Sequence, residues 1–339
     1  MMAEILVYLL AFLLSYYLTP VFIKYFKEIG VVAIDMHKRG KPKIAGAGGV
    51  PVALSIIFSI LVYIGLKTFL EKPDSRVITE YMAMVSSILM IMFIGFLDDI
   101  RILKKKTRTK IGEKDIRVGL PQWLKPLATI PAAIPLMVIK AGSSTMTLPI
   151  IGTVNFGLVY PLILVPIGVV GASNMVNLLG GFNGSEAGMG IVYMLTLGII
   201  ALHNNIGIYP LFFISCLSLL GFIIHNWYPA RILPGDSLTY LLGSIVASGV
   251  IVGNMEKAGV MVLSLFFLEF ILKLRSKLKA TSLGKLRRDG TIAPPYGKKI
   301  YSVTHIVMNL GKFTEKQISI MLVIIQMIIS TIVLLSYLL

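Results

Sequence analysis

The stretch YMAMVSSILMIMFIGFLDDI, residues 81–100, predicts the fold class of this chain. Its first seventeen residues, Tyr81 to Leu97, carry no charge, and a helix of about that length crosses the apolar core of a bilayer. Asp98 and Asp99 follow directly, although a carboxylate near the centre of a membrane costs several kcal/mol. The pair therefore belongs at the boundary between lipid and water. Two acids there, followed by a dense basic segment, predict chemistry on an anionic molecule at the membrane surface.

The composition of the 339 residues also indicates a membrane protein. Hydrophobic residues make up 56% and charged residues 14%, and the mean hydropathy is +0.85, whereas a soluble domain is nearer half apolar and a quarter charged. In a soluble protein a net charge of +16 would suggest a nucleic-acid partner. In a membrane protein it indicates orientation in the bilayer and contact with anionic substrates or lipid headgroups. We therefore expect membrane lipids as partners and no nucleic acid.

About ten segments have the length that a bilayer-crossing helix needs. Their approximate limits are 3–23, 48–70, 81–98, 123–140, 158–176, 187–203, 208–225, 237–254, 257–273 and 316–338. Proline interrupts several of them, which membrane helices tolerate. The sequence therefore predicts an all-α polytopic membrane protein with about ten transmembrane helices, in one integral membrane domain over residues 1–339.

Basic residues alternate between rich and poor loops along the chain. Only five of the 32 lysine and arginine residues fall in the poor loops: Lys67, Lys72, Arg76, Lys140 and Lys257. By the positive-inside rule the rich loops are cytoplasmic. Both termini are then extracytoplasmic, as an even number of spans requires. Residues 273–315, between the last two spans, become a large cytoplasmic loop.

Residues 143–156, SSTMTLPIIGTVNF, are too short to span a bilayer. Thr145 to Leu148 and Thr153 to Phe156 have the composition of short strands around a Pro and a Gly. The sequence therefore predicts a small β-hairpin on the outer face, with a plain loop as the alternative.

Nearly all polar side chains with chemical potential fall on the predicted cytoplasmic side. They belong to the end of the third span, the turn between the fifth and sixth spans, and the start of the eighth span. The residues concerned are Asp98, Asp99, Asn174, Asn177, Asn183, Glu186 and Asp236. Asn174 and Asn177 are three positions apart, so they face one way on a helix. Glycines in the turn allow a ligand to approach the backbone closely.

This set of residues suits a nucleoside diphosphate bound with Mg²⁺, or with Mn²⁺ as a substitute. Oxygens such as those of Asn177 and Asp236 are ligands that Mg²⁺ takes together with phosphate oxygens. A carboxylate of Asp98 or Asp99 could orient or deprotonate a nucleophile, or act on the metal. Each feature also has a structural explanation. The acid pair could be a solvated helix end, the asparagines could join helices by hydrogen bonds, and Asp236 could cap the eighth span.

Four motifs together resemble the polyprenyl-phosphate sugar-1-phosphate transferases. They are FIGFLDDI (93–100), NMVNLLGGFNGSEAG (174–188), NWYPARILPGDSLTYLLG (226–243) and GKFTEKQIS (311–319). Within that family the chain is most similar to the eukaryotic and archaeal type that makes dolichyl-diphosphate-GlcNAc from UDP-GlcNAc. The NGSE form of the second motif, and the lack of a histidine cluster in the last cytoplasmic loop, favour UDP-GlcNAc over UDP-MurNAc-pentapeptide.

The resemblance implies roles for individual residues. Asp98 and Asp99 match the acidic pair of the catalytic centre, and Asn177 and Asp236 match the Mg²⁺ ligands. Lys125 matches a lysine near the phosphates.

Further substrate-binding residues are implied around the nucleotide. Asn183 matches an asparagine near the uracil, Glu186 follows it, Asn174 belongs to the same motif, and Lys38 falls in the first cytoplasmic loop. The loop 273–315 is implied to recognise the substrate, but the family's Arg-His-Arg cluster is absent from it. The basic residues that could stand in are Lys279, Lys285, Arg287 and Arg288.

The implied reaction is transfer of GlcNAc-1-phosphate from UDP-GlcNAc to dolichyl or another polyprenyl phosphate, which begins lipid-linked oligosaccharide assembly for N-glycosylation. Direct attack by the lipid phosphate is favoured over a covalent aspartyl intermediate. The implied location is the plasma membrane of an archaeon, with the active site facing the cytoplasm, and a homodimer is left open. The alternatives are a related transferase that uses another UDP-sugar, and a transporter or flippase of an anionic lipid-linked substrate.

Overall fold

A computed structural model describes residues 2–100, 103–109, 112–118, 121, 123–148 and 152–339. Within these ranges, eight helical segments are long and apolar enough to cross a membrane. They are α1 (Met2–Glu28), α2 (Gly49–Leu70), α3 (Ser75–Ile100), η2 with α6 (Tyr160–Leu164 and Val165–Leu178), α7 (Ser185–His203), α8 (Tyr209–Asn226), α9 (Gly235–Val252) and α13 (Glu315–Leu338). The predicted all-α polytopic membrane fold is confirmed.

The fourth of the ten expected spans is an interrupted helix. It consists of α4 (Leu124–Thr129), η1 (Ile130–Ala133) and α5 (Ile134–Val138). Pro131 and Pro135 lie at the starts of the second and third pieces. Proline has no N–H to donate and clashes with the preceding turn, so each proline ends one piece and begins the next.

The ninth expected span is also interrupted, for a different reason. It consists of α10 (Glu256–Val262) and α11 (Ser264–Leu274), separated by Leu263. The fully buried side chain of Gln326, from α13, donates a hydrogen bond to the Val262 carbonyl at 3.0 Å. An unpaired carbonyl inside a membrane costs several kcal/mol, so this bond stabilises the break. Eight long helices and two interrupted ones therefore stand where ten continuous spans were expected.

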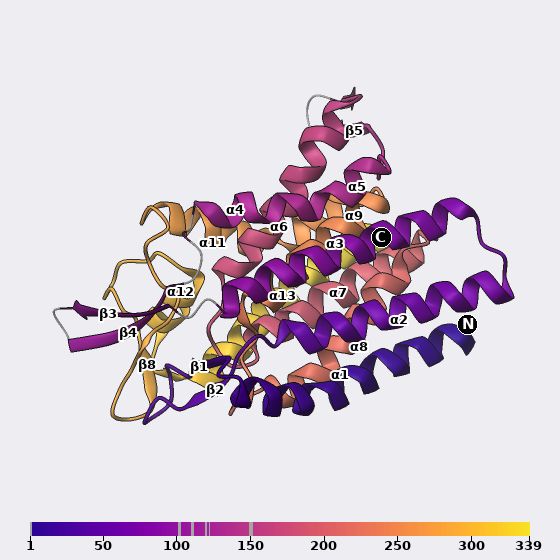
Figure 1. The fold of residues 1–339 in the computed structure, drawn as a ribbon. Helices are drawn as coiled ribbons and strands as arrows, with labels where there is room; N and C mark the ends of the chain where they lie inside the picture. Colours follow the sequence, from indigo (N-terminus) through magenta and orange to yellow (C-terminus); the bar gives the residue numbers. More distant parts are fainter. Residues whose placement is uncertain (1, 101–102, 110–111, 119–120, 122, 149–151) are drawn as a thin grey trace.

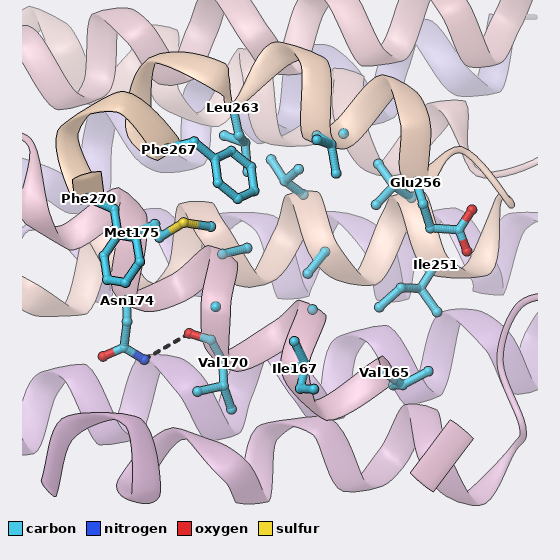
Figure 2. Close-up of a pocket in the computed structure, with 18 of the residues that line it drawn as sticks. Val165, Ile167, Val170, Asn174, Met175, Ile251, Glu256, Leu263, Phe267 and Phe270 are labelled. Atoms are coloured by element: carbon cyan, nitrogen blue, oxygen red, sulfur yellow. Dashed lines mark hydrogen bonds between the residues drawn. The ribbon is translucent and has the colours of Figure 1, made fainter. Parts of the chain in front are cut away.

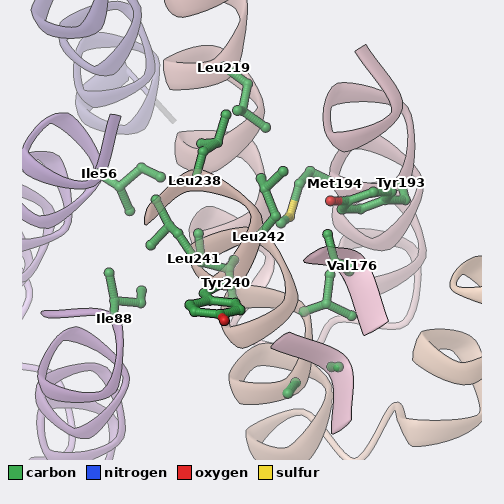
Figure 3. Packing of buried hydrophobic residues seen from close by; sticks show 14 of the residues in the cluster. Ile56, Ile88, Val176, Tyr193, Met194, Leu219, Leu238, Tyr240, Leu241 and Leu242 are labelled. Atoms are coloured by element: carbon green, nitrogen blue, oxygen red, sulfur yellow. The ribbon is translucent and has the colours of Figure 1, made fainter. Parts of the chain in front are cut away.

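Helix α9 lies at the centre of the bundle, and 89% of its apolar window is buried. Helices α3 and α6 pack against it through small residues. A Cβ at Gly95 of α3 would lie 2.6 Å from Cα of Ser237, and one at Gly243 of α9 would clash with the backbone of Ala172 in α6. Figure 3 shows the side chains of α9, including Leu241, among those of its neighbours. Close packing of this kind replaces the hydrophobic effect as the force between membrane helices.

Short strands and one short helix gather at one end of the bundle (Figure 1). They are β1 (Val32–Ile34), β2 (Lys43–Ala45), β3 (Leu103–Thr109), β4 (Gly112–Val118), β7 (Lys285–Leu286), β8 (Thr291–Ala293), β9 (Phe313–Thr314) and α12 (Val303–Leu310). We call this end the basic end, because it carries the loops rich in lysine and arginine. Both chain termini lie toward the opposite end (Figure 1). The side of the membrane that they face stays a prediction from the charge pattern.

The predicted hairpin is confirmed away from the basic end. Strands β5 (Thr145–Leu148) and β6 (Gly152–Asn155) pair antiparallel, with Thr145 opposite Asn155 and Leu148 opposite Gly152. The second strand begins one residue earlier than the sequence indicates. Pro149 lies outside the described residues.

Candidate active site

Three charged side chains from three helices meet at the basic end. Lys125, in the first turn of α4, donates a hydrogen bond to Oδ2 of Asp236 at 2.7 Å, and its ammonium lies 2.8 Å from Oδ2 of Asp98. Asp98 belongs to the last turn of α3 and Asp236 to the first turn of α9. The Asp98 side chain is fully buried, whereas 31% of the Asp236 side chain is exposed. One cation therefore holds two carboxylates together, and one of them faces an opening.

Asp99 has a different environment from its neighbour Asp98. Its Oδ1 accepts the backbone N–H of Asp236 at 2.7 Å, and its Oδ2 accepts that of Ser237 at 3.1 Å. The first N–H groups of a helix have no partner within the helix, and a negative charge is favourable there. Gly235 has φ +71°, and a Cβ on it would clash with this carboxylate. Asp99 therefore supplies the cap that was one explanation for Asp236.

Replacing Asp99 with asparagine is expected to lower turnover about tenfold and stability by about 1 kcal/mol. The amide would point its NH₂ group at one of the two backbone N–H groups and lose that hydrogen bond. The start of α9, and with it the Asp236 carboxylate, would then shift. Steady-state turnover and thermal unfolding in detergent measure the two effects.

Asp74→Asn is the matched control for this variant. Asp74 accepts the backbone N–H of Arg76 at 3.0 Å, at the start of α3 and at the opposite end of the bundle. We expect it to leave turnover unchanged. If Asp99→Asn turned over substrate as fast as the wild type, a role for Asp99 in positioning Asp236 would be contradicted.

The two asparagines of α6 have different surroundings. Asn174 donates hydrogen bonds to Oγ1 of Thr129 at 3.1 Å and to the carbonyl of Val170 at 2.8 Å, so it joins α6 to the end of α4. Asn177 lies beside the Asp236 carboxylate. Apart from its contact with Asp236, its buried amide nitrogen has no hydrogen-bond partner among the described residues. Because the two ends of an amide can exchange by a flip, Asn177 can present an oxygen at the same point.

These residues fit a magnesium ion bound together with phosphate. Among the described residues, no group of three or more His, Cys, Asp or Glu side chains is placed to hold a metal by itself. Mg²⁺ commonly takes one or two carboxylates and completes its shell with water and substrate phosphates. Asp236, the amide of Asn177 and the nearby Asp98 supply oxygens of that kind. The donor set therefore suits an ion that arrives with a phosphorylated substrate.

Asn183 belongs to a second polar cluster at the basic end. Its side-chain nitrogen donates to Oδ2 of Asp35 at 3.0 Å, and its backbone N–H donates to Oε1 of Glu315 at 3.0 Å. Lys38 donates a hydrogen bond to Glu315 and lies 3.6 Å above the ring centroid of Tyr228. The two expected nucleotide-side residues, Asn183 and Lys38, are thus brought together by two acids.

The sequence reasoning did not single out Asp35 or Glu315. Glu315 directly follows Thr314, which forms a capping box with Gln317 at the start of α13. This pattern marks a helix start. It gives no sign that the intervening glutamate also belongs to the second polar cluster. In the sequence, residues 311–319 stand out only as part of a family motif.

Glu186 closes the glycine turn between α6 and α7. Its Oε1 accepts the backbone N–H of Gly181 at 2.7 Å, and its Oε2 accepts the hydroxyl of Ser185 at 2.7 Å. Both carboxylate oxygens are therefore engaged within the turn, and only 6% of the residue is exposed. Glu186 shapes the turn that carries Asn183.

The last loop lies against the first loop at the basic end. Its candidate substrate-binding residues are Lys279, Lys285, Arg287 and Arg288. Arg287 donates to the Thr291 hydroxyl at 3.3 Å, and the Arg288 carbonyl accepts a hydrogen bond from the Arg39 guanidinium at 2.6 Å. None of the four side chains forms an ion pair within the described part of the chain. All four therefore keep their charge available to an anion.

An apolar cavity of about 620 Å³ opens beside the charged cluster. Lys125 and Asn177 border it at the basic end, and Tyr160 and Glu256 border it at the other end. Its walls come from α6, α9, α10 and α11, and Figure 2 shows their side chains converging on it. Gly171 of α6 lines it without filling it, since a Cβ there would meet nothing within 4 Å. The cavity can hold a long apolar chain whose polar end reaches Lys125.

A membrane helix bundle with a charged cluster at one end and an apolar cavity leading away from it suits an integral membrane transferase. The chain belongs to glycosyl transferase family 4, whose family model matches residues 81–254. The matched segment contains the acid pair, Lys125, the glycine turn and Asp236. It ends before the loop of residues 273–315.

Three relatives extend the comparison along the chain. A Saccharolobus solfataricus protein provisionally named UDP-N-acetylglucosamine–dolichyl-phosphate N-acetylglucosaminephosphotransferase is 34% identical over 95% of this chain and 92% of its own length. A Dictyostelium discoideum protein of that name is 25% identical over 93% of this chain and 83% of its own. A Streptococcus agalactiae phospho-N-acetylmuramoyl-pentapeptide-transferase is 29% identical over 73% of this chain and 72% of its own.

Proposed function

We propose that this protein transfers GlcNAc-1-phosphate from UDP-GlcNAc to dolichyl phosphate or another polyprenyl phosphate, with release of UMP. The observation that carries the proposal is the position of the Lys125 cluster at the mouth of the 620 Å³ apolar cavity. A buried cation suits phosphate groups, and an adjoining apolar cavity suits the prenyl chain of the acceptor. The names of the Saccharolobus and Dictyostelium relatives support the same reaction.

In the proposed reaction the lipid phosphate is the nucleophile. A phosphate monoester is largely ionised at neutral pH, so it needs no strong base. One of its oxygens bonds to the β-phosphorus of UDP-GlcNAc as the bond from that phosphorus to the bridging oxygen breaks, and UMP leaves with the bridging oxygen. Lys125 neutralises the phosphates, and Asp98 holds Lys125 in place. Positioning and charge neutralisation account for most catalysis of phosphoryl transfer, so no aspartyl intermediate is required.

Asp236 and Asn177 would hold Mg²⁺, or Mn²⁺ in its place. When bound, such an ion neutralises charge on a diphosphate. The chain's own contribution is to fix the carboxylate of Asp236, because Asp99 binds the backbone N–H groups of Asp236 and Ser237. Chelation with EDTA is expected to stop transfer, and excess Mg²⁺ to restore it. Full activity after exhaustive chelation would contradict the metal assignment.

The nucleotide is expected to bind from the cytoplasm. The charge pattern places the basic end on that side, and we propose that residues 273–315 recognise the sugar nucleotide there. Their three-stranded sheet and α12 lie next to the first loop, where Gly284 donates its N–H to Nε2 of His37 at 3.1 Å. We further propose the plasma membrane of an archaeon as the location and N-glycan assembly as the pathway.

Transfer of label tests the proposed function directly. Purified protein is incubated with radiolabelled UDP-GlcNAc, Mg²⁺ and dolichyl phosphate, and we expect labelled lipid and UMP in equal amounts. Release of UDP in place of UMP, or label that stays with the nucleotide, would overturn the proposal. Competition by UDP-GalNAc and UDP-MurNAc-pentapeptide distinguishes transferases for other donors. Movement of lipid-linked sugar across vesicles without UMP release would favour a flippase.

A further inference from the structure

Helix α11 carries a buried ion pair outside the charged cluster of the candidate site. Glu269 and Lys273 lie one turn apart, with 3.5 Å between Oε1 and Nζ. Glu269 is fully buried and Lys273 is 4% exposed. Phe267 and Phe270 of the same helix line the apolar cavity (Figure 2). Neither residue of the ion pair lines the cavity, so the proposed reaction does not account for the pair.

The pair holds both ends of the last loop. Oε2 of Glu269 accepts the backbone N–H of Val303 at 2.7 Å and the hydroxyl of Ser302 at 2.9 Å. Lys273 donates to the carbonyl of Ala280 at 2.8 Å. Segments far apart along the loop are thus fastened to one turn of α11.

The same pair reaches the end of the helix that carries Asn177. Lys273 donates to Oγ of Ser282 at 2.8 Å. The Ser282 hydroxyl has two acceptors within reach, the carbonyl of Leu178 at 3.0 Å and Oε1 of Glu269 at 3.3 Å, and the Leu178 carbonyl is the nearer one. Leu178 is the last residue of α6 and directly follows Asn177. The last carbonyls of a helix have no partner within it, and a nearby cation is favourable there. Lys273 and Ser282 therefore cap the end of α6 beside Asn177.

A buried ion pair contributes little net stability, because removing two charges from water offsets most of their attraction. A set of apolar side chains could hold the loop as well. Hydrogen bonds, unlike apolar contacts, are directional. Those of the ion pair hold backbone atoms of the loop and, through Ser282, of α6 in fixed positions.

We infer that Glu269 and Lys273 form a positioning pair that sets Asn177 for binding of metal and diphosphate. This inference rests on the proposed function. The pair acts through Ser282 and the end of α6 and does not itself touch substrate. Loss of the pair therefore weakens metal-dependent binding of the nucleotide and leaves binding of the lipid acceptor unchanged.

Glu269→Gln tests the inference. The glutamine oxygen still accepts the N–H of Val303, but its NH₂ group faces Lys273. The ammonium of Lys273 is then no longer attracted, so Lys273 and Ser282 shift from their positions. Using UDP as the probe, calorimetric titration at several Mg²⁺ concentrations is expected to show about tenfold weaker Mg²⁺-dependent binding, the scale of an outer-shell substitution. In turnover, KM for UDP-GlcNAc rises by a similar factor, and KM for the lipid does not change.

Two further variants separate positioning from folding. Ser282→Ala removes the link from the ion pair to Leu178, together with the contacts of the hydroxyl to Lys273 and Glu269, and keeps the ion pair itself. It is expected to change UDP binding in the same direction. Glu80→Gln removes an ion pair with Arg76 of the same i, i+4 spacing at the other end of the bundle and leaves binding unchanged. A lower unfolding temperature with unchanged UDP binding in both Glu269→Gln and Ser282→Ala would overturn the inference.

The binding readout also separates this inference from the proposed reaction. If the wild-type protein transfers no GlcNAc-1-phosphate, the proposed reaction is wrong. Weaker Mg²⁺-dependent UDP binding in Glu269→Gln would still support the positioning pair in that case. If Glu269→Gln raised only the KM for the lipid, the positioning role of the pair would be contradicted, whereas the proposed reaction would not.

Discussion

Turnover of Asp236→Asn is expected to fall by roughly 10²–10³-fold, the scale on which single electrostatic groups act in a preorganised site. The substitution keeps the shape of the side chain and removes its charge. Lys125 then loses one of its two acidic partners and keeps Asp98, at 2.8 Å. The exposed oxygen that would face the metal and the phosphates becomes a weaker ligand. Initial rates of label transfer at saturating substrates measure the loss.

The matched control for Asp236→Asn is Asp289→Asn. Asp289 lies in the last loop at the same end of the molecule, where hydrogen bonds from Thr291 hold the pKa of its carboxyl below the usual value. At neutral pH its replacement therefore also removes one negative charge. We expect turnover near that of the wild type, because Asp289 lies outside the Lys125 cluster. If Asp236→Asn kept more than a third of wild-type turnover at every Mg²⁺ concentration, the site assignment would be wrong.

Gly171→Leu is expected to raise KM for the polyprenyl phosphate roughly ten- to fiftyfold, with KM for UDP-GlcNAc unchanged. Gly171 lines the cavity, and a Cβ there meets nothing within 4 Å, so the backbone accepts a side chain and a leucine would fill space that the prenyl chain uses. Each displaced methylene group forfeits about 0.8 kcal/mol, and displacement of about two or three gives that factor. Rates measured against acceptor concentration test it.

Gly65→Leu provides the control, because Gly65 also lies inside a long helix with nothing within 4 Å of its Cβ position. It is not among the residues that line the cavity. Both substitutions replace glycine in a helix, which favours the helix by up to about 1 kcal/mol, so neither is expected to unfold the protein. An unchanged KM for the lipid in Gly171→Leu would contradict the assignment of the cavity to the prenyl chain.

Local sequence patterns predicted most of the helices. Long uncharged runs predicted the eight long helices, and alternating residues around a turn predicted the hairpin of β5 and β6. Prolines signalled that the segment 123–140 would be irregular. No local signal marked the break at Leu263, because the side chain that stabilises it, Gln326, is 64 residues from the carbonyl it binds.

The candidate site was predicted in its residue types and only partly in its contacts. Asp98, Lys125 and Asp236 were expected near one another, and the structure joins them. Asn174 and Glu186 were expected near substrate. The structure binds both carboxylate oxygens of Glu186 within its turn, whereas Asn174 binds Thr129 and also lines the apolar cavity, and their contact with substrate stays a prediction. Short motifs reveal which side chains can bind phosphate or metal, but a neighbouring helix can use the same groups.

The sequence by itself determined the membrane class, the orientation expected from charge, and the residue types of the site, because hydrophobic length and charge bias are properties of continuous segments. The difference between the two adjacent acids arises from the packing of the helices. Asp98 meets Lys125, whereas Asp99 meets the start of α9, 137 residues away along the chain. Adjacent residues on a helix point about 100° apart, so the packing of α4 and α9 against α3 determines which acid lies in the charged cluster and which one caps a helix.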